Sequence, residues 1–256
     1  WFEAARQDFS QQEVPSLNLG SPENQYATSG GEAWTINSYF ARLNYVLMDK
    51  YIVEANFRAD ASSRFHPDYR WGYFPGVSVA WRLNEEKFIK DLNIFDNLKI
   101  RGSYGEMGNQ SGIGLYDYIP LISISNSYYP FGKGNRASLS YVNSMVSLTR
   151  SWETVATYDI GADLGFLNNR LTASADFFKK INNNMLIPVT YPSILGADAP
   201  MTNNGRLEIK GWELTLGWQD KLGDFGYSIK ASISDARNLV VEKGGSDAYT
   251  LGLNKT

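Results

Sequence analysis

The sequence predicts an all-β protein, a transmembrane antiparallel β-barrel, and three observations support this. Apolar and polar residues alternate along successive segments, so each segment has one apolar and one polar face. The charged residues of these segments fall on a single face. The connections between segments are alternately short and long. A barrel that crosses a membrane shows this combination, because its short turns lie on one side of the membrane and its long loops on the other.

The alternation is clearest in residues 51–81, which are predicted to form a hairpin. In the first run Val53 and Phe57 alternate with Glu54 and Arg58, and the second run, residues 73–84, follows the same period. Both runs are long for soluble strands, which most often have about 5–6 residues. They suit the roughly 9–11 residues of a tilted membrane-spanning strand.

The first half of the chain supplies the other early elements. Residues 1–37 are predicted to form a polar loop, and a strand at 39–47 then turns tightly into the hairpin. The two hairpin strands are joined by a polar loop, residues 61–72. Residues 84–97 have the spacing of one or two helical turns, with Asn84 as the candidate cap. A strand at 98–104 precedes a long loop, residues 106–151, in which a short hairpin is expected around residues 116–124.

The second half repeats the pattern. Strands are predicted at residues 154–166, 171–180, 212–218 and 227–233. Short turns join them in pairs, and long loops are predicted at residues 181–207 and 236–256. The chain therefore supplies about eight strands.

The alternation also assigns the two faces. Apolar residues predicted to face lipid are Leu43, Val53, Val79, Ile100, Ile160, Leu214 and Ile229. Charged residues predicted to face the lumen include Arg42, Glu54, Arg82, Arg101 and Asp159. Aromatic residues gather near both ends of the strands, as interfacial belts do.

Composition excludes several classes of function. The net charge of −3 gives no cationic surface for nucleic acid. Because cysteine is absent and His66 is the single histidine, cysteine-ligated zinc, thiol nucleophiles and multi-histidine metal sites are excluded. We expect no metal, no cofactor and no catalytic residues, since carboxylates on the polar face are what a water-filled barrel needs.

Two other interpretations of the same pattern remain open. One is a soluble β-sandwich binding module, because alternation alone does not say which face is inside. The other is a small closed barrel with a structural or adhesive role. Such a barrel would be filled by side chains, and the polar face has small residues such as Gly161, Ser174 and Ser232 where bulky ones would be needed.

Several motifs, in the same order, resemble a known family. DASSRFHPDYRWGYFPGVSVAWRLNEEKF and the following LKIRGSYGEMGNQSGIGLYDY look like the C-terminal barrel half of SusC/RagA-family TonB-dependent transporters. WETVATYDIGADLGFLNNRLTASADFFKK and the later GWELTLGW resemble the succeeding strands. The similarity covers residues 38–241. One departure is Ala61, where the family typically has glycine.

The resemblance implies a cellular location, a function and partners. It implies a multi-pass barrel of about 22 strands in the cell outer membrane. Residues 1–256 would be part of its barrel domain, with the plug domain absent from the chain. Family members typically import oligosaccharides or peptides, pair with a SusD-like surface lipoprotein and are energised by the TonB complex through the plug segment.

The long loops are the predicted location of the binding site. By strand parity, residues 61–72, 106–151 and 181–207 lie at one end of the barrel and form one extracellular surface. Planar faces next to hydrogen-bonding groups suit a polar oligomeric ligand. The candidate substrate-binding residues are Asn109, Gln110, Tyr116, Tyr118, Tyr128, Tyr129 and Arg136.

Overall fold

The computed structural model divides the chain into two compact units, Trp1–Thr35 and Ile36–Thr256. It describes residues 1–7, 21, 23, 25–131, 135–142, 144–189, 194 and 196–243, except the side chains of residues 125–138. In the first unit, β1 (Phe2–Arg6) pairs antiparallel with β2 (Gln25–Ser29). The prediction that residues 1–37 are a loop is therefore wrong for these two strands.

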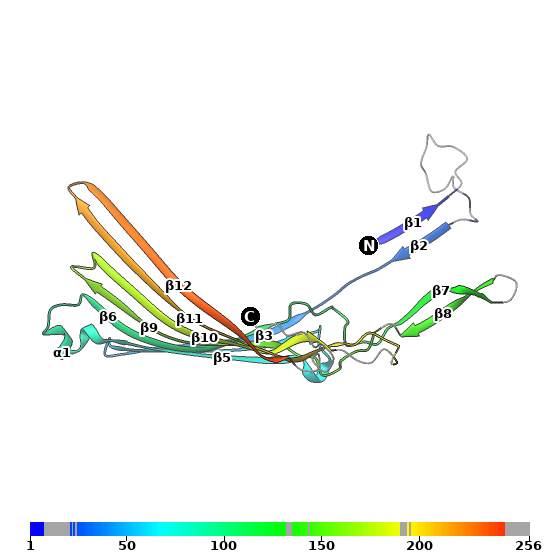
Figure 1. Cartoon of the computed structure of the whole chain (residues 1–256), viewed down its shortest axis with the longest axis horizontal. Coiled ribbons are helices and arrows are strands. Elements are labelled where there is room, and N and C mark those ends of the chain that lie inside the picture. Colours follow the sequence, from blue (N-terminus) through cyan, green and yellow to red (C-terminus); the bar gives the residue numbers. More distant parts are fainter. Residues whose placement is uncertain are drawn as a thin grey trace. The chain divides into compact units, whose positions relative to one another are not determined.

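The second unit contains an eight-stranded antiparallel sheet, which confirms the predicted fold class (Figure 1). The order across the sheet is β12-β11-β10-β9-β6-β5-β4-β3. In chain order its strands are β3 (Ile36–Leu47), β4 (Tyr51–Ser62), β5 (Trp71–Arg82), β6 (Asn97–Asn109), β9 (Glu153–Phe166), β10 (Leu171–Pro188), β11 (Met201–Leu222) and β12 (Phe225–Lys243). Neighbours in sequence are neighbours in the sheet, as in an up-and-down barrel wall.

Three predicted loops contain more strand than expected. The hairpin within residues 106–151 is formed by β7 (Ile122–Phe131) and β8 (Asn135–Val142), downstream of the predicted position. Most of the predicted loop at 181–207 is strand, since β10 and β11 still pair at Leu186 and Asn203. Strand β12 likewise extends to Lys243, and residues 244–256 lie outside the described part. Polar residues pair in these segments because the ladder depends on backbone groups, whatever the side chains.

Short helical elements occupy the predicted connection at residues 84–97, and one further turn lies where only a loop was predicted. A 3₁₀ turn, η3 (Leu83–Glu85), and α1 (Lys87–Lys90) fill the connection from β5 to β6, and η2 (Pro67–Tyr69) lies between β4 and β5. Asn84 is not a helix cap, because its Oδ1 instead accepts a hydrogen bond of 3.3 Å from the backbone N of Leu98. No helix in the described part of the chain is long and apolar enough to cross a membrane.

The register between strands aligns the apolar residues of the whole sheet into one face. One continuous row across it consists of Tyr45, Val53, Val79, Gly102, Ile160, Phe177 and Trp212. The adjacent row carries Glu54, Ser78, Ser103 and Asp159 on the opposite face. Ile160 is 60% exposed and Leu43 is 68% exposed, so the described residues leave the apolar face uncovered. A face of this extent requires an apolar environment outside the chain.

Aromatic pairs mark both edges of this apolar face. Near the short turns, Tyr51 stacks on Trp81 with ring centroids 5.9 Å apart, and both donate hydrogen bonds to Glu86. The hydrogen bonds from Lys50 and Trp81 hold the pKa of Glu86 below its usual value. At the other end Phe57 stacks on Tyr73 at 6.3 Å. The two groups have the placement of interfacial belts.

Strands β10 to β12 continue past the apolar region at the end opposite α1. They contain 18, 22 and 19 residues, well above the roughly 9–11 that a membrane-spanning strand needs. In the parts of these strands beyond the apolar region, charged residues lie on the face that is apolar nearer to α1. Lys179 pairs with Glu208 at 3.1 Å, and Arg237 pairs with Asp235 at 3.4 Å. The prediction that all charges of the strands fall on a single face is therefore wrong for Lys179, and the one-sided pattern ends where these strands leave the apolar band.

Candidate binding site

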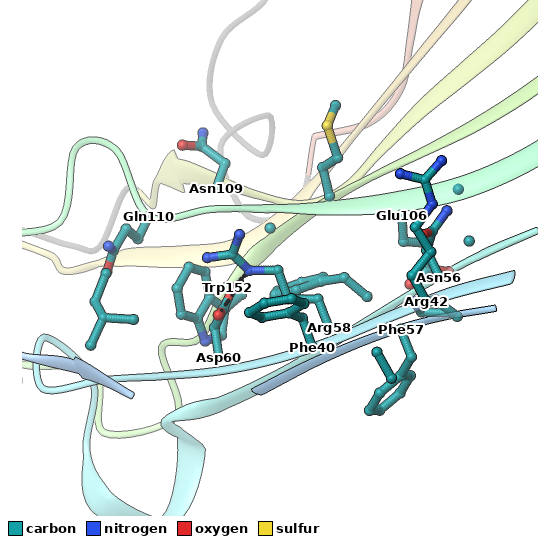
Figure 2. Close-up of a pocket in the computed structure, with 18 of the residues that line it drawn as sticks. Phe40, Arg42, Asn56, Phe57, Arg58, Asp60, Glu106, Asn109, Gln110 and Trp152 are labelled. Carbon is teal, nitrogen blue, oxygen red and sulfur yellow. Dashed lines mark hydrogen bonds and ion pairs between the residues drawn. The ribbon is translucent and has the colours of Figure 1, made fainter. Parts of the chain in front are cut away.

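A cavity of about 880 Å³ lies at the end of the sheet where the long connections are (Figure 2). Its lining comes from β3 to β6, from Gln110 and Ser111 just after β6, and from Trp152 just before β9. Figure 2 shows Phe40, Arg58, Asp60 and Trp152 between the ribbon of β6 and the ribbons of β3 and β4, while Phe57 points away from them. The principal polar and aromatic lining residues are Phe40, Arg42, Asn56, Arg58, Asp60, Phe74, Glu106, Asn109, Gln110 and Trp152.

The cavity exists because two strands separate. The pairing of β5 with β6 ends at Gly76 and Gly105, although β5 remains paired with β4 as far as Trp71. Strand β6 likewise remains paired with β9 up to Asn109. Beyond the two glycines the sheet divides into two parts, and the space between them is the cavity.

A small, mostly aromatic core packs against one side of the cavity. Phe65, Phe74, Ile113 and Trp152 are all buried and form one cluster. The Trp152 ring lies 5.2 Å from Phe65 and 5.6 Å from Phe74, and its Nε1 donates a 2.8 Å hydrogen bond to the carbonyl of Arg70. The core thereby ties the connection between β4 and β5 to the segment that precedes β9.

Two glycines leave room for these rings. A Cβ on Gly108 would collide with the ring of Phe74, and a Cβ on Gly72 would meet Phe74 and Trp152. By strand parity, Gly108 belongs to the apolar face and Phe74 to the polar face, so alternation alone would keep them apart. They meet because the strands separate beyond Gly76 and Gly105.

The polar lining consists largely of paired charges. Arg58 donates from Nε to both carboxylate oxygens of Asp60, at 2.9 and 2.7 Å, and Asp60 itself is buried. Arg42 Nη2 donates to Glu54 across the strand pair at 2.7 Å. Asn56 donates a hydrogen bond of 2.8 Å to the other oxygen of Glu54. The cavity thus presents guanidinium and amide groups beside aromatic rings.

The structure brings together only some of the predicted site residues. Asn109 and Gln110 line the cavity; Asn109 donates to Glu153 at 2.9 Å and Gln110 accepts from Ser62 at 2.6 Å. Tyr116 and Tyr118 lie in the following turns, where Tyr118 meets His66 edge to face. Tyr128 and Tyr129 are in β7 and Arg136 is in β8, and their side chains lie outside the described part.

Sequence reasoning missed Phe40, Arg58 and Trp152 as lining residues. A signal was present for Phe40, which is an aromatic residue on the otherwise polar phase of its strand. No comparable signal existed for Trp152, since its position depends on the separation of β5 from β6.

Carboxylates on the polar face of β9 and β10, where a catalytic pair could be sought, are held in ion pairs. Arg101 contacts Asp159 at 3.2 Å, Asp163 at 3.4 Å and Asp176 at 2.6 Å. Lys99 adds a second contact to Asp163 at 2.8 Å. This cluster stabilises the polar face of β6, β9 and β10, and its carboxylates have the partners that a structural role requires.

Comparisons with known proteins agree on one family. A family model described as "TonB dependent receptor-like, beta-barrel" matches residues 2–252. TonB-dependent receptor SusC of Bacteroides thetaiotaomicron is 34% identical over 229 residues, covering 88% of this chain and 22% of the relative. TonB-dependent receptor P26 of Formosa agariphila is 30% identical over 244 residues, covering 92% of this chain and 24% of the relative.

Solved structures give the same fold. The RagAB peptide importer in its "open-open" state matches with a TM-score of 0.74 and 26% identity, over 96% of this chain and 26% of the matched chain. The structure titled RagAB peptide transporter matches with a TM-score of 0.73 and 26% identity, over 91% of this chain and 26% of that one. The chain therefore spans about a quarter of the length of the proteins it matches.

Proposed function

The chain belongs to the TonB-dependent receptor β-barrel family, and from this premise we propose that it forms part of an importer of oligosaccharides or peptides. The protein is an outer-membrane β-barrel, and the eight-stranded sheet is part of a larger barrel wall. The apolar face meets lipid, and the polar face lines the lumen.

The observation that carries the proposal is the one-sided register of the sheet together with the cavity on its polar face. A continuous polar wall suits a water-filled passage, and the aromatic and amide lining of the cavity suits a polar ligand. Binding and passage require no bond to be made or broken, so we assign no enzymatic activity.

The proposed partners follow from the relatives. A SusD-like surface lipoprotein would cover the extracellular loops, and the TonB complex would supply energy through a plug domain outside residues 1–256. The RagAB peptide importer supports peptides as one substrate class. Oligosaccharides remain the other class proposed.

Uptake by cells that produce the intact protein tests this function. Labelled oligosaccharides and peptides that copurify with the native complex should accumulate inside wild-type cells and should fail to accumulate when TonB is depleted. A surface lipoprotein should copurify with the barrel. Accumulation that is independent of both TonB and this protein would contradict the proposal.

The candidate loop residues are tested in the same assay. Alanine at Tyr116, Tyr128 and Arg136 should weaken uptake or lipoprotein binding, because these side chains are proposed to contact ligand or partner. Barrel abundance and heat-modifiability should stay unchanged, since the substitutions leave the strands of the large sheet intact. If abundance falls in step with uptake, these residues are structural and the assignment is wrong.

A further inference from the structure

We propose that the cavity recognises a ligand bearing a carboxylate group and that Arg58 is the residue that binds it. This inference rests on the proposed import function and narrows its substrate class. Arg58 lines the cavity and its side chain is 59% exposed. It enters the site from β4, between Phe40 of β3 and Phe74 of β5, which are its direct cross-strand partners.

The guanidinium of Arg58 is fixed at one end and available at the other. Its Nε donates to both oxygens of Asp60, and within the described residues its two Nη atoms have no hydrogen-bond acceptor. Asp60 is 6% exposed, so it anchors the guanidinium from within the wall. The two terminal amino groups together present the parallel donors that match the two oxygens of a carboxylate.

The neighbouring arginine lacks this arrangement. Arg42 also lines the cavity, but its Nη2 already donates to Glu54 from the next strand. The carboxylates Glu54 and Asp60 are thus each paired with an arginine of the lining, and Glu106 accepts a hydrogen bond from Tyr104. Arg58 is therefore the better placed of the two arginines to receive an incoming carboxylate.

Phe40 indicates what accompanies the carboxylate. Its ring is 85% exposed on the polar face, directly opposite Arg58 in the register. An aromatic ring beside a guanidinium favours a ligand with an apolar or planar surface next to its anionic group. The ring of a uronic acid and the C-terminal residue of a peptide both have this chemistry.

The test measures ligand binding to the purified full-length transporter with two pairs of probes. One pair is tetragalacturonate and its methyl ester, and the other is an acetylated tripeptide ending in phenylalanine and its C-terminal amide. In at least one pair the acid should bind about ten- to a hundredfold more tightly than its neutral partner, the range expected for a charge-assisted hydrogen-bonded pair. The pair that shows the preference identifies the source of the carboxylate.

Substitutions then assign the preference to Arg58. Arg58→Gln should remove the preference, because the acid loses a charge-assisted partner whereas a neutral probe loses at most an uncharged hydrogen bond. Arg58→Lys should retain part of the preference, because the charge remains without the planar fork. Arg237→Gln is the matched control. Arg237 also pairs with an aspartate two residues away, but it lies outside the cavity, so the preference should persist.

Two results would overturn the inference. One is equal affinity for acid and neutral probes in both pairs, and the other is an acid preference that survives in correctly folded Arg58→Gln. Because binding is measured without TonB or transport, the outcome separates from that of the uptake assay. If the protein shows no TonB-dependent uptake but still prefers the acid probe through Arg58, only the proposed import function is refuted.

Discussion

Replacing Ile160 by arginine should prevent most of the protein from assembling in the outer membrane, whereas Ser78→Arg should be tolerated. Ile160 lies in the middle of the apolar row, between Gly102 of β6 and Phe177 of β10. An arginine facing lipid near the bilayer midplane costs about 2–4 kcal/mol. Ser78 lies on the other face, opposite Glu54, where an added guanidinium meets water and a carboxylate. The folded fraction can be measured by heat-modifiability of outer-membrane extracts.

The difference in folded fraction between Ile160→Arg and Ser78→Arg shows which face of the sheet meets lipid. Arginine has the same size and charge at both positions, so a difference in the folded fraction reports which face meets lipid. Equal tolerance of both substitutions, or better tolerance of Ile160→Arg, would contradict the assigned orientation.

Gly108→Ala should open the aromatic core that closes the cavity. The added Cβ would collide with the ring of Phe74, which is buried against Trp152. Overpacking of a well-packed core typically costs about 1–3 kcal/mol. The connection between β4 and β5 should then detach, exposing Arg64 and Arg70, whose guanidinium groups now donate to the carbonyls of Ile113 and Phe65. Trypsin added to intact cells should cleave there faster than in the wild type.

Gly105→Ala is the matched control for this variant. Gly105 belongs to the same strand, and a Cβ placed on it meets no atom of the described residues within 4 Å. Its rate of cleavage by trypsin should equal that of the wild type. Equal cleavage of both variants would show that the packing of Phe74 against Gly108 does not hold the connection.

Sequence alone predicted the middle of each strand of the large sheet. In these middle parts the alternation of side chains fixes the pairing register, because one face is apolar and a shift of one residue would place charged side chains in lipid. Val53, Val79 and Ile160 illustrate this, since their predicted common face is the one that the register produces.

Strand ends were less predictable. Outside the apolar band neither face of the sheet meets lipid, so apolar and polar residues no longer need to alternate. Asn182 of β10 and Asn203 of β11 have the composition of a loop, yet both pair through their backbones. Lys179 and Arg237 occupy positions that the charge pattern would leave apolar, and ion pairs with acidic neighbours hold them there.

The candidate site was predicted in part. Asn109 and Gln110 were predicted from the amide-containing sequence at the end of β6. The approach of Trp152 to Phe74 could not be predicted, since it depends on where β5 parts from β6, and a strand glycine such as Gly76 or Gly105 is equally compatible with uninterrupted pairing. The pairing of Arg58 with Asp60 could not be predicted either, because it depends on the conformations of both side chains.

The central claim is that one face of this sheet meets lipid and the other meets water. Residues 1–256 contain no cysteine. Single cysteines at Val77, Ser78, Val79 and Ala80 can therefore each carry a nitroxide spin label in the intact protein in bilayers, with any cysteine outside these residues replaced by serine. We predict that relaxation by oxygen is high at 77 and 79, and that relaxation by a water-soluble nickel complex is high at 78 and 80. The same accessibility at all four positions, or the opposite alternation, would contradict this orientation of the sheet.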